Sequence, residues 1–165
     1  MNRRLFLGGA SAVLGAWAAP ALARAALLPA DAVFGRAFDT LQGVSQPLSD
    51  YQGRPVVLNF WASWCAPCVR EMPLLESIHH QQPELALVGL AIDTRANVQR
   101  FLEKIQVSYP LLLTGTQGIP LMRDLGNKSG GLPFTAFFNR QGRLVSTAMG
   151  ELKPEDLQAR VRQIL

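Results

Sequence analysis

Pro55-Val-Val-Leu-Asn-Phe-Trp61, followed at once by Ala62-Ser-Trp-Cys-Ala-Pro-Cys68, is the stretch that decides the fold. The first seven residues are mostly apolar, β-branched or aromatic, a composition typical of a strand buried on both faces. A helix is expected directly afterwards, from about Cys65 to Gln82. The sequence therefore predicts a Cys-x-x-Cys motif at the N-terminus of a helix that follows a buried strand.

This position gives the two cysteines a specific chemistry. Unpaired backbone N–H groups and the positive end of the helix dipole stabilise a thiolate there. They can lower the pKa of a thiol from about 8.5 into a range of roughly 3.5 to 7.5. Cys68 follows Cys65 by three residues and lies on the same helix face, within reach of a mixed disulfide formed on Cys65. Pro67 is tolerated in the first turn, where its missing N–H has no partner. We therefore expect Cys65 to attack a substrate disulfide and Cys68 to resolve the mixed disulfide that forms.

Other uses of the motif fit less well. Cys65 and Cys68 are the only cysteines of the chain, and the adjacent His79 and His80 point in different directions, so the sequence does not supply the four ligands of a zinc site. A structural disulfide that closes so small a loop stabilises little. A copper carrier remains an alternative, because soft thiolates suit Cu(I). A peroxiredoxin-type peroxidase would need a Pro-x-x-x-Thr-x-x-Cys setting, which the residues before Cys65 do not supply.

The rest of the chain alternates strands and helices, which predicts an α/β fold with helices on both faces of a sheet. Asp93-Thr94 is expected to cap a helix that runs to about Ile105, and Pro154 lies in the first turn of the last helix. Residues 26–35 are expected to form an exposed lead-in. The predicted strands are a hairpin around Gln42-Gly43 within 36–49, then 85–92 and 111–113, and a second hairpin formed by 134–138 and 144–149.

The N-terminal segment has the features of an export signal. Arg3 and Arg4 precede an uncharged stretch from Leu5 to Ala23, and small residues follow at the expected cleavage site. Arg3-Arg4-Leu-Phe-Leu7 resembles the twin-arginine type, with the Sec route as an alternative. An uncleaved membrane anchor is the other interpretation, since the stretch is just long enough to span a bilayer. We therefore expect 1–25 to be the signal and 26–165 to form a single domain.

Charge argues against nucleic acid as a partner. The 165 residues carry 16 basic and 12 acidic side chains, a formal net charge of +4. Cleavage after Ala25 would remove Arg3, Arg4 and Arg24, which leaves 13 basic and 12 acidic side chains and a net charge of +1. No basic run occurs in the remainder, so nothing in it indicates a nucleic-acid interface.

Phe60-Trp-Ala-Ser-Trp-Cys-Ala-Pro-Cys68 resembles the active-site segment of thioredoxins. The wider pattern Cys68-Val-Arg-Glu-Met-Pro73 is similar to the exported branch of TlpA-, ResA- and DsbE(CcmG)-like thiol-disulfide oxidoreductases. The resemblance implies a thioredoxin-like fold, with a central mixed β-sheet flanked by helices and an N-terminal β-hairpin extension.

The same resemblance also implies reduction of protein disulfides in the periplasm, for cytochrome c maturation or copper-centre assembly. A membrane electron donor of the DsbD or CcdA kind would supply the electrons. No cofactor or metal is expected beyond the redox-active Cys65–Cys68 disulfide, and the direction of electron flow stays open.

Glu71 is the expected proton acceptor beside Cys68. Cytoplasmic thioredoxins carry a buried aspartate in the strand before the motif, and Asn59 stands in its place here. Glu71 lies one helical turn after Cys68 on the same face. Our hypothesis is that partial burial raises the pKa of Glu71 and that its carboxylate helps to deprotonate Cys68. The alternative is a solvated surface glutamate.

Gly131-Leu-Pro-Phe-Thr135 resembles the cis-proline loop of the same family. The resemblance implies a cis bond before Pro133 and places the loop opposite the cysteines. The backbone of Leu132 would then pair with an extended substrate segment. Trp64 is expected at the rim of the substrate site, with Ala66 and Pro67 between the cysteines, whereas Trp61 is expected in the core.

Overall fold

The computed structural model describes residues 30–165. The predicted export signal, residues 1–25, and the start of the predicted domain lie outside the described residues.

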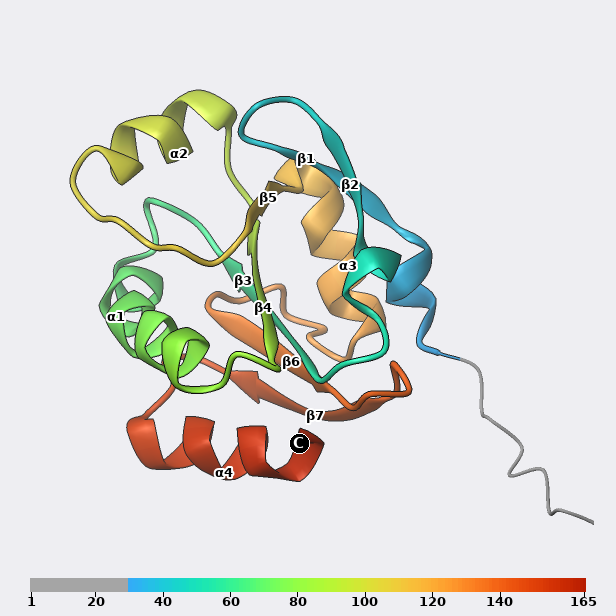
Figure 1. Ribbon diagram of the computed structural model, residues 1–165. Helices are drawn as coiled ribbons and strands as arrows, with labels where there is room; N and C mark the ends of the chain where they lie inside the picture. Colours follow the sequence, from blue (N-terminus) through green and yellow to red (C-terminus); the bar gives the residue numbers. More distant parts are fainter. Residues whose placement is uncertain (1–29) are drawn as a thin grey trace, which may run out of the picture.

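A seven-stranded mixed sheet in the order β2-β1-β5-β4-β3-β6-β7 forms the centre of the fold (Figure 1). The three strands β3, β4 and β5 are parallel, while β1, β6 and β7 run antiparallel to their neighbours. The sheet and the N-terminal hairpin confirm the predicted architecture. The strands are β1 Ala37–Thr40, β2 Ser45–Pro47, β3 Val56–Trp61, β4 Ala86–Ala91, β5 Leu111–Leu113, β6 Phe134–Phe138 and β7 Leu144–Met149.

Helices cover both faces of the sheet, as predicted. One apolar cluster joins α1, α2 and α4 to the sheet, and the other joins α3 and the N-terminal segment to the opposite face. Figure 1 shows α1 and α2 on one side of the strands and α3 on the other. The helices are α1 Ala66–Gln81, α2 Arg95–Leu102, α3 Gly118–Asp124 and α4 Pro154–Ile164. Within residues 30–165, none of the helices has the length and apolar character that a membrane span requires.

Strand β3 lies between β4 and β6 and is buried along its whole length. Alternate side chains of β3 pack into the two apolar clusters. Val57 and Trp61 belong to the cluster beneath α1, and Leu58 and Phe60 belong to the cluster beneath α3. The strand therefore anchors the Cys-x-x-Cys loop at its carboxyl end, and Trp61 lies in the core as predicted.

The structure departs from the sequence-based expectations at three places along the chain. The part of the expected exposed lead-in that the structure describes, residues 30–35, is not simply exposed, because Ala32–Gly35 form a short 3-10 helix that buries Val33 and Phe34. The Asp31 carboxylate caps this turn by accepting from the Val33 N–H at 3.0 Å. Helix α3 was not predicted, although its buried side chains, Leu121, Met122 and then Leu125, follow helical spacing. Helix α2 also ends earlier than expected, at Leu102.

Candidate active site

Cys65 and Cys68 are joined by a disulfide with an S–S distance of 2.03 Å. Cys65 is the N-cap residue of α1, and its sulfur accepts from the Cys68 N–H at 3.3 Å. Cys68 is completely buried, whereas Cys65 keeps 6% of its surface exposed. The sulfur that the sequence assigns to attack is therefore the one closer to solvent, and the resolving sulfur lies beneath it.

Once the pair is reduced, the helix N-terminus acts on Cys65. The first backbone N–H groups of α1 have no partner within the helix and point toward the cap residue. The partial positive charge of the helix end favours the thiolate over the thiol. This position at the helix N-terminus supports the expectation that Cys65 is the attacking cysteine.

Glu71 belongs to the buried face of α1. Its side chain is 2% exposed and lies in a row with Cys68, Met72, Leu75 and Ile78. Its Oε1 accepts from Asn59 Nδ2 at 2.8 Å, and its Oε2 accepts from the Leu152 N–H at 2.8 Å. This burial excludes a solvated surface glutamate.

Burial raises the pKa of Glu71 to about 7, although the hydrogen bonds from Leu152 and Asn59 oppose the rise. A carboxyl group with this pKa is present in both protonation states near neutral pH. It can accept a proton from a neighbouring thiol and release it again. The burial of Glu71 agrees with the hypothesis, and its role in deprotonating Cys68 stays a prediction.

Asn59 connects Glu71 to the sheet, which was not foreseen. Asn59 lies opposite Thr135 in the antiparallel β3–β6 pair, so both side chains project to the same face. Its Nδ2 also donates to Thr135 Oγ1 at 3.0 Å. The signal in the sequence was a polar residue in the middle of a buried strand, because such a residue needs a buried partner.

The loop before β6 lies at the same end of the sheet as the cysteines. Phe134 is in register with Phe60 on β3, so Pro133 lies level with the end of that strand. The Leu132–Pro133 peptide bond is cis, as the resemblance implied. Pro133 is buried and Leu132 is partly exposed. The structure thus brings the loop to the carboxyl end of β3, where the Cys-x-x-Cys loop begins.

Two neighbours that the sequence did not reveal hold this loop. The Gly150 N–H donates to the Pro133 carbonyl oxygen at 2.9 Å. The completely buried Asn127 donates from Nδ2 to the Gly131 carbonyl oxygen at 2.8 Å. Both contacts join residues outside the predicted strands, so spacing alone gave no indication of them.

Asp93 fixes the other side of the active-site loop. Its Oδ2 accepts from the Ser63 N–H at 2.9 Å and from Ser63 Oγ at 2.6 Å. Its Oδ1 accepts from the Thr94 N–H at 2.7 Å and from Asn97 Nδ2 at 2.8 Å. Thr94 is the N-cap of α2, so Asp93 links this cap to the loop that carries Cys65. Partial burial pushes the pKa of Asp93 up, but the hydrogen bonds from Ser63, Asn97 and Thr94 outweigh it and hold the pKa below its ordinary value.

The remaining predicted contact residues surround the disulfide on the surface. Trp64 is 68% exposed, Ala66 is exposed and Pro67 is half-buried. His80 is exposed on α1 and contacts Glu76. His79 is partly buried against the Tyr109 ring. Among residues 30–165, no group of three His, Cys, Asp or Glu side chains is placed to hold a metal ion.

A disulfide at the N-terminus of a helix that leaves a buried central strand, faced by a loop with a cis proline, is the arrangement of thioredoxin-like thiol-disulfide oxidoreductases. The sequence agrees with this class. The chain belongs to the AhpC/TSA family, whose model matches residues 30–147.

The individual similarities are to ResA- and DsbE-like proteins. The thiol-disulfide oxidoreductase ResA of Bacillus cereus is 30% identical over 129 residues, covering 75% of this chain and 71% of ResA. The structure of MTB DsbF, in mixed oxidized and reduced forms, superposes with a TM-score of 0.72 at 26% identity, covering 82% of this chain and 99% of DsbF. A secreted Mycobacterium tuberculosis disulfide oxidoreductase homologous to E. coli DsbE gives 0.67 at 25% identity, covering 81% and 99%. The protein is thus a thiol-disulfide oxidoreductase with a thioredoxin-like fold.

Proposed function

We propose that this protein is a periplasmic reductant of protein disulfides that serves cytochrome c maturation or the assembly of a copper centre. The observation that carries the proposal is the buried Glu71, which lies one helical turn beyond the buried Cys68. A pair that must be oxidised by its substrate needs a base for its second thiol, and Glu71 has the burial and the pKa of such a base. The similarity to ResA supports the same class of reaction.

The reaction begins with the reduced pair. The Cys65 thiolate attacks one sulfur of a substrate disulfide, so that the substrate S–S bond breaks and a mixed disulfide forms. The released substrate thiolate takes up a proton. Glu71 then accepts the proton of the Cys68 thiol, and the Cys68 thiolate attacks the sulfur of Cys65. The second substrate thiolate leaves, and two electrons have passed from the protein to the substrate, which leaves the Cys65–Cys68 disulfide.

The substrate site in this proposal lies around the disulfide. The backbone of Leu132, before Pro133, pairs with an extended segment of the substrate. The exposed Trp64 forms the rim, and Ala66 and Pro67 form the surface between the cysteines. No cofactor other than the cysteine pair takes part.

Location and electron supply follow from the export signal that the sequence predicts. A reductant in an oxidising compartment must be reduced again by a donor in the membrane, of the DsbD or CcdA kind. The twin-arginine route is the proposed route of export. The description of the M. tuberculosis homologue as secreted supports an exported protein.

A redox titration of the purified protein tests the direction of electron flow. We expect a potential near or below that of thioredoxin, about −270 mV. A value close to that of a strong oxidant, about −120 mV, would overturn the proposal. Mixed disulfides trapped on a Cys68→Ser variant would then identify the substrate. Copper retained in stoichiometric amount by a protein without disulfide-reducing activity would favour the copper carrier instead.

A further inference from the structure

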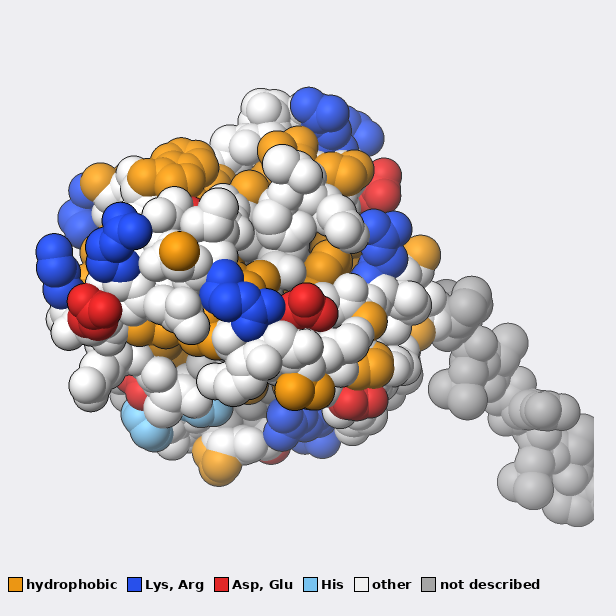
Figure 2. Space-filling view, turned by 90° about the horizontal axis from the view of Figure 1, so that it is seen from above, with side chains coloured by type: hydrophobic (Ala, Val, Ile, Leu, Met, Phe, Trp, Pro, Cys, Tyr) orange, Lys and Arg blue, Asp and Glu red, His pale blue; other side chains and the backbone are white. Residues whose placement is uncertain are grey.

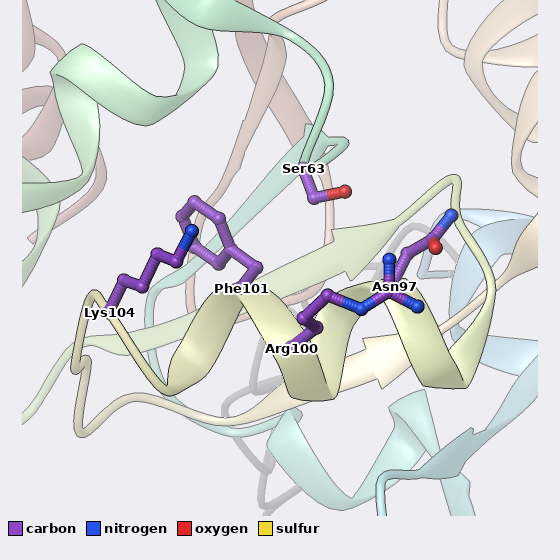
Figure 3. A pocket seen from close by; sticks show the side chains of 5 residues that line it. All are labelled: Ser63, Asn97, Arg100, Phe101 and Lys104. Atoms are coloured by element: carbon purple, nitrogen blue, oxygen red, sulfur yellow. The ribbon is translucent and has the colours of Figure 1, made fainter.

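A cationic pocket opens between α2 and the loop that carries Ser63 and Cys65. We call it the α2 pocket. Its volume is about 200 Å³, and Figure 3 shows the side chains that line it: Ser63, Asn97, Arg100, Phe101 and Lys104. Arg100 and Lys104 are four residues apart, so both side chains leave the helical segment on one side. Ser63 comes from the facing loop, two residues before Cys65. The pocket therefore holds two cations next to the loop that carries the nucleophile.

Neither cation of this pocket is neutralised by the described part of the chain. No ion pair of residues 30–165 includes Arg100 or Lys104, whereas Arg95 on the same helix lies 3.9 Å from an Asp39 oxygen. Figure 2 shows Lys and Arg side chains at the left edge of the view, the side on which α2 lies, with an acidic side chain beside them and other basic side chains elsewhere on the face. A guanidinium and an ammonium group offer only hydrogen-bond donors, so they fit an oxyanion, and the carboxylate is the oxyanion that an unmodified protein substrate carries.

Three of the five side chains that line the α2 pocket, those of Ser63, Asn97 and Phe101, are held by contacts within the protein. The Asp93 carboxylate holds the hydroxyl and N–H of Ser63 and the amide of Asn97. The Asp93 carboxylate accepts four hydrogen bonds in all, and no ion pair of residues 30–165 joins it to Arg100. The Phe101 ring packs against Trp61 with ring centroids 5.3 Å apart. These contacts leave only the exposed Arg100 and Lys104 side chains to be ordered when a ligand enters.

The α2 pocket continues toward the exposed tryptophan of the active-site loop. A second hollow of about 330 Å³ shares Asn97 with it and is lined by Trp64, Ile92, Asp93, Thr94, Gly115 and Thr116. A peptide segment lying along Ser63 and Trp64 would therefore meet an apolar surface at one end and two cations at the other. This continuity connects the cations to the surface next to Cys65.

We propose that the α2 pocket receives an acidic side chain of the protein substrate, so that cysteines flanked by Asp or Glu are preferred. Opposite charges across an interface increase the rate of productive encounter and fix the register of the bound segment. The inference rests on the proposed function, since it names a substrate class for the same disulfide exchange.

The test compares two peptides with one protein. Each peptide has a single cysteine, blocked as a mixed disulfide with β-mercaptoethanol. One peptide carries Glu two residues before and after the cysteine, and the other carries Gln there. The reduced protein should react faster with the Glu peptide, by roughly threefold to tenfold at low salt, because exposed ion pairs contribute up to about 1 kcal/mol each. The preference should decrease as salt is added.

Substitutions test whether the cations of the α2 pocket cause the preference for the Glu peptide. The ratio of the two rates should fall to about one in Arg100→Gln/Lys104→Gln and should invert in Arg100→Glu/Lys104→Glu. Arg54→Gln/Arg140→Gln removes the same charge next to the start of β3 and after β6, at the opposite end of the sheet, and should keep the ratio. Equal rates with the unaltered protein, or an equal loss in this control, would overturn the inference and leave the proposed function standing. Failure to reduce either peptide would overturn both.

Discussion

Asn59 Nδ2 donates to Glu71 Oε1 at 2.8 Å and joins the middle of β3 to α1 beneath the disulfide. Both side chains are buried, with exposed fractions of 1% and 2%. An amide cannot take up a proton near neutral pH, so Glu71 is the member of the pair that titrates. The replacement of the thioredoxin aspartate by Asn59 thus moves the ionisable group from the strand to the helix.

The first prediction concerns stability and pH. The pKa of Glu71 is raised to about 7, above its value in an unfolded chain. The folded protein therefore binds the proton more tightly, and this stabilisation is complete below about pH 4 and is lost as the pH rises through 7. Across that range the oxidised protein should lose on the order of 3 kcal/mol of its free energy of unfolding relative to Glu71→Gln. Urea unfolding from pH 4 to pH 8 measures the difference.

A matched control for this experiment is Glu155→Gln. Glu155 is an exposed residue of α4, so the same chemical change should leave the pH dependence of unfolding as it is in the unaltered protein. If Glu71→Gln and Glu155→Gln gave parallel curves, Glu71 would not be the titrating group.

The second prediction concerns the resolving thiol. With Glu71→Gln, the mixed disulfide on Cys65 should be resolved about 100-fold more slowly at pH 7, the lower end of the effect of a general base. The deficit should shrink as the pH rises, because the Cys68 thiol then loses its proton to solvent. Quenched-flow measurement of the mixed disulfide between pH 6 and pH 10 tests this. A rate reduced equally at every pH would point to a structural role instead.

The titration of Cys68 provides an independent check. In a Cys65→Ser background, the ultraviolet absorbance of the Cys68 thiolate should rise in two coupled steps when Glu71 is present. It should rise in a single step in Glu71→Gln. An unchanged profile would contradict the assigned role of Glu71.

The sequence predicted the elements that carry strong local patterns. The apolar run of β3, the Cys-x-x-Cys motif and Pro154 at the start of α4 each lie within about one residue of the expected place. Glu71 could be placed on the face of Cys68 from helical spacing alone. Its burial could be foreseen only as a hypothesis, because it depends on α1 packing over the sheet.

Contacts between distant segments were not predictable in this way. Asn59 meets Thr135 because β3 and β6 are in register, and the two residues are 76 positions apart. Asp93 meets Ser63 because β3 and β4 end side by side at Trp61 and Ala91. Helix α3 was missed because it has only seven residues, begins at Gly118 and contains Pro120, all of which weaken the helical signal.

The third prediction concerns the anchor of the active-site loop. Asp93→Asn keeps the size of the side chain but replaces one carboxylate oxygen by an NH2 group that cannot accept, so either the Ser63 donors or those of Thr94 and Asn97 lose their acceptor. Hydrogen bonds to a charged group contribute about 1.5 to 3 kcal/mol, and partial exposure reduces that, so we expect a loss of about 1 kcal/mol at pH 7. Because the pKa of Asp93 is lowered in the fold, the stabilisation is present above the ordinary pKa and is lost as the pH falls below it.

The deficit of Asp93→Asn should therefore be largest near neutral pH and should shrink under strongly acid conditions. Asp124→Asn, at an exposed position of α3, is the matched control and should change the free energy of unfolding little at any pH. A deficit of Asp93→Asn that is constant with pH would argue that shape, and not charge, holds the loop.

The last prediction concerns Gly89, in the middle of β4. A Cβ at this position would lie 2.5 Å from Leu111 Cδ2 and 3.1 Å from Trp61 Nε1, both inside the core beneath α1. Gly89→Ala should therefore lower the free energy of unfolding by about 1 to 3 kcal/mol, because an added methyl group forces packed neighbours to move. Gly35→Ala, where the added atom meets nothing within 4 Å, should change it by no more than about 0.5 kcal/mol. Leu111→Val removes the overlapping Cδ2, so the double variant Gly89→Ala/Leu111→Val should be more stable than the sum of the single effects predicts. If urea unfolding gave a loss of free energy of unfolding equal to the sum of the two single losses, Leu111 would not be the side chain that the added methyl group displaces.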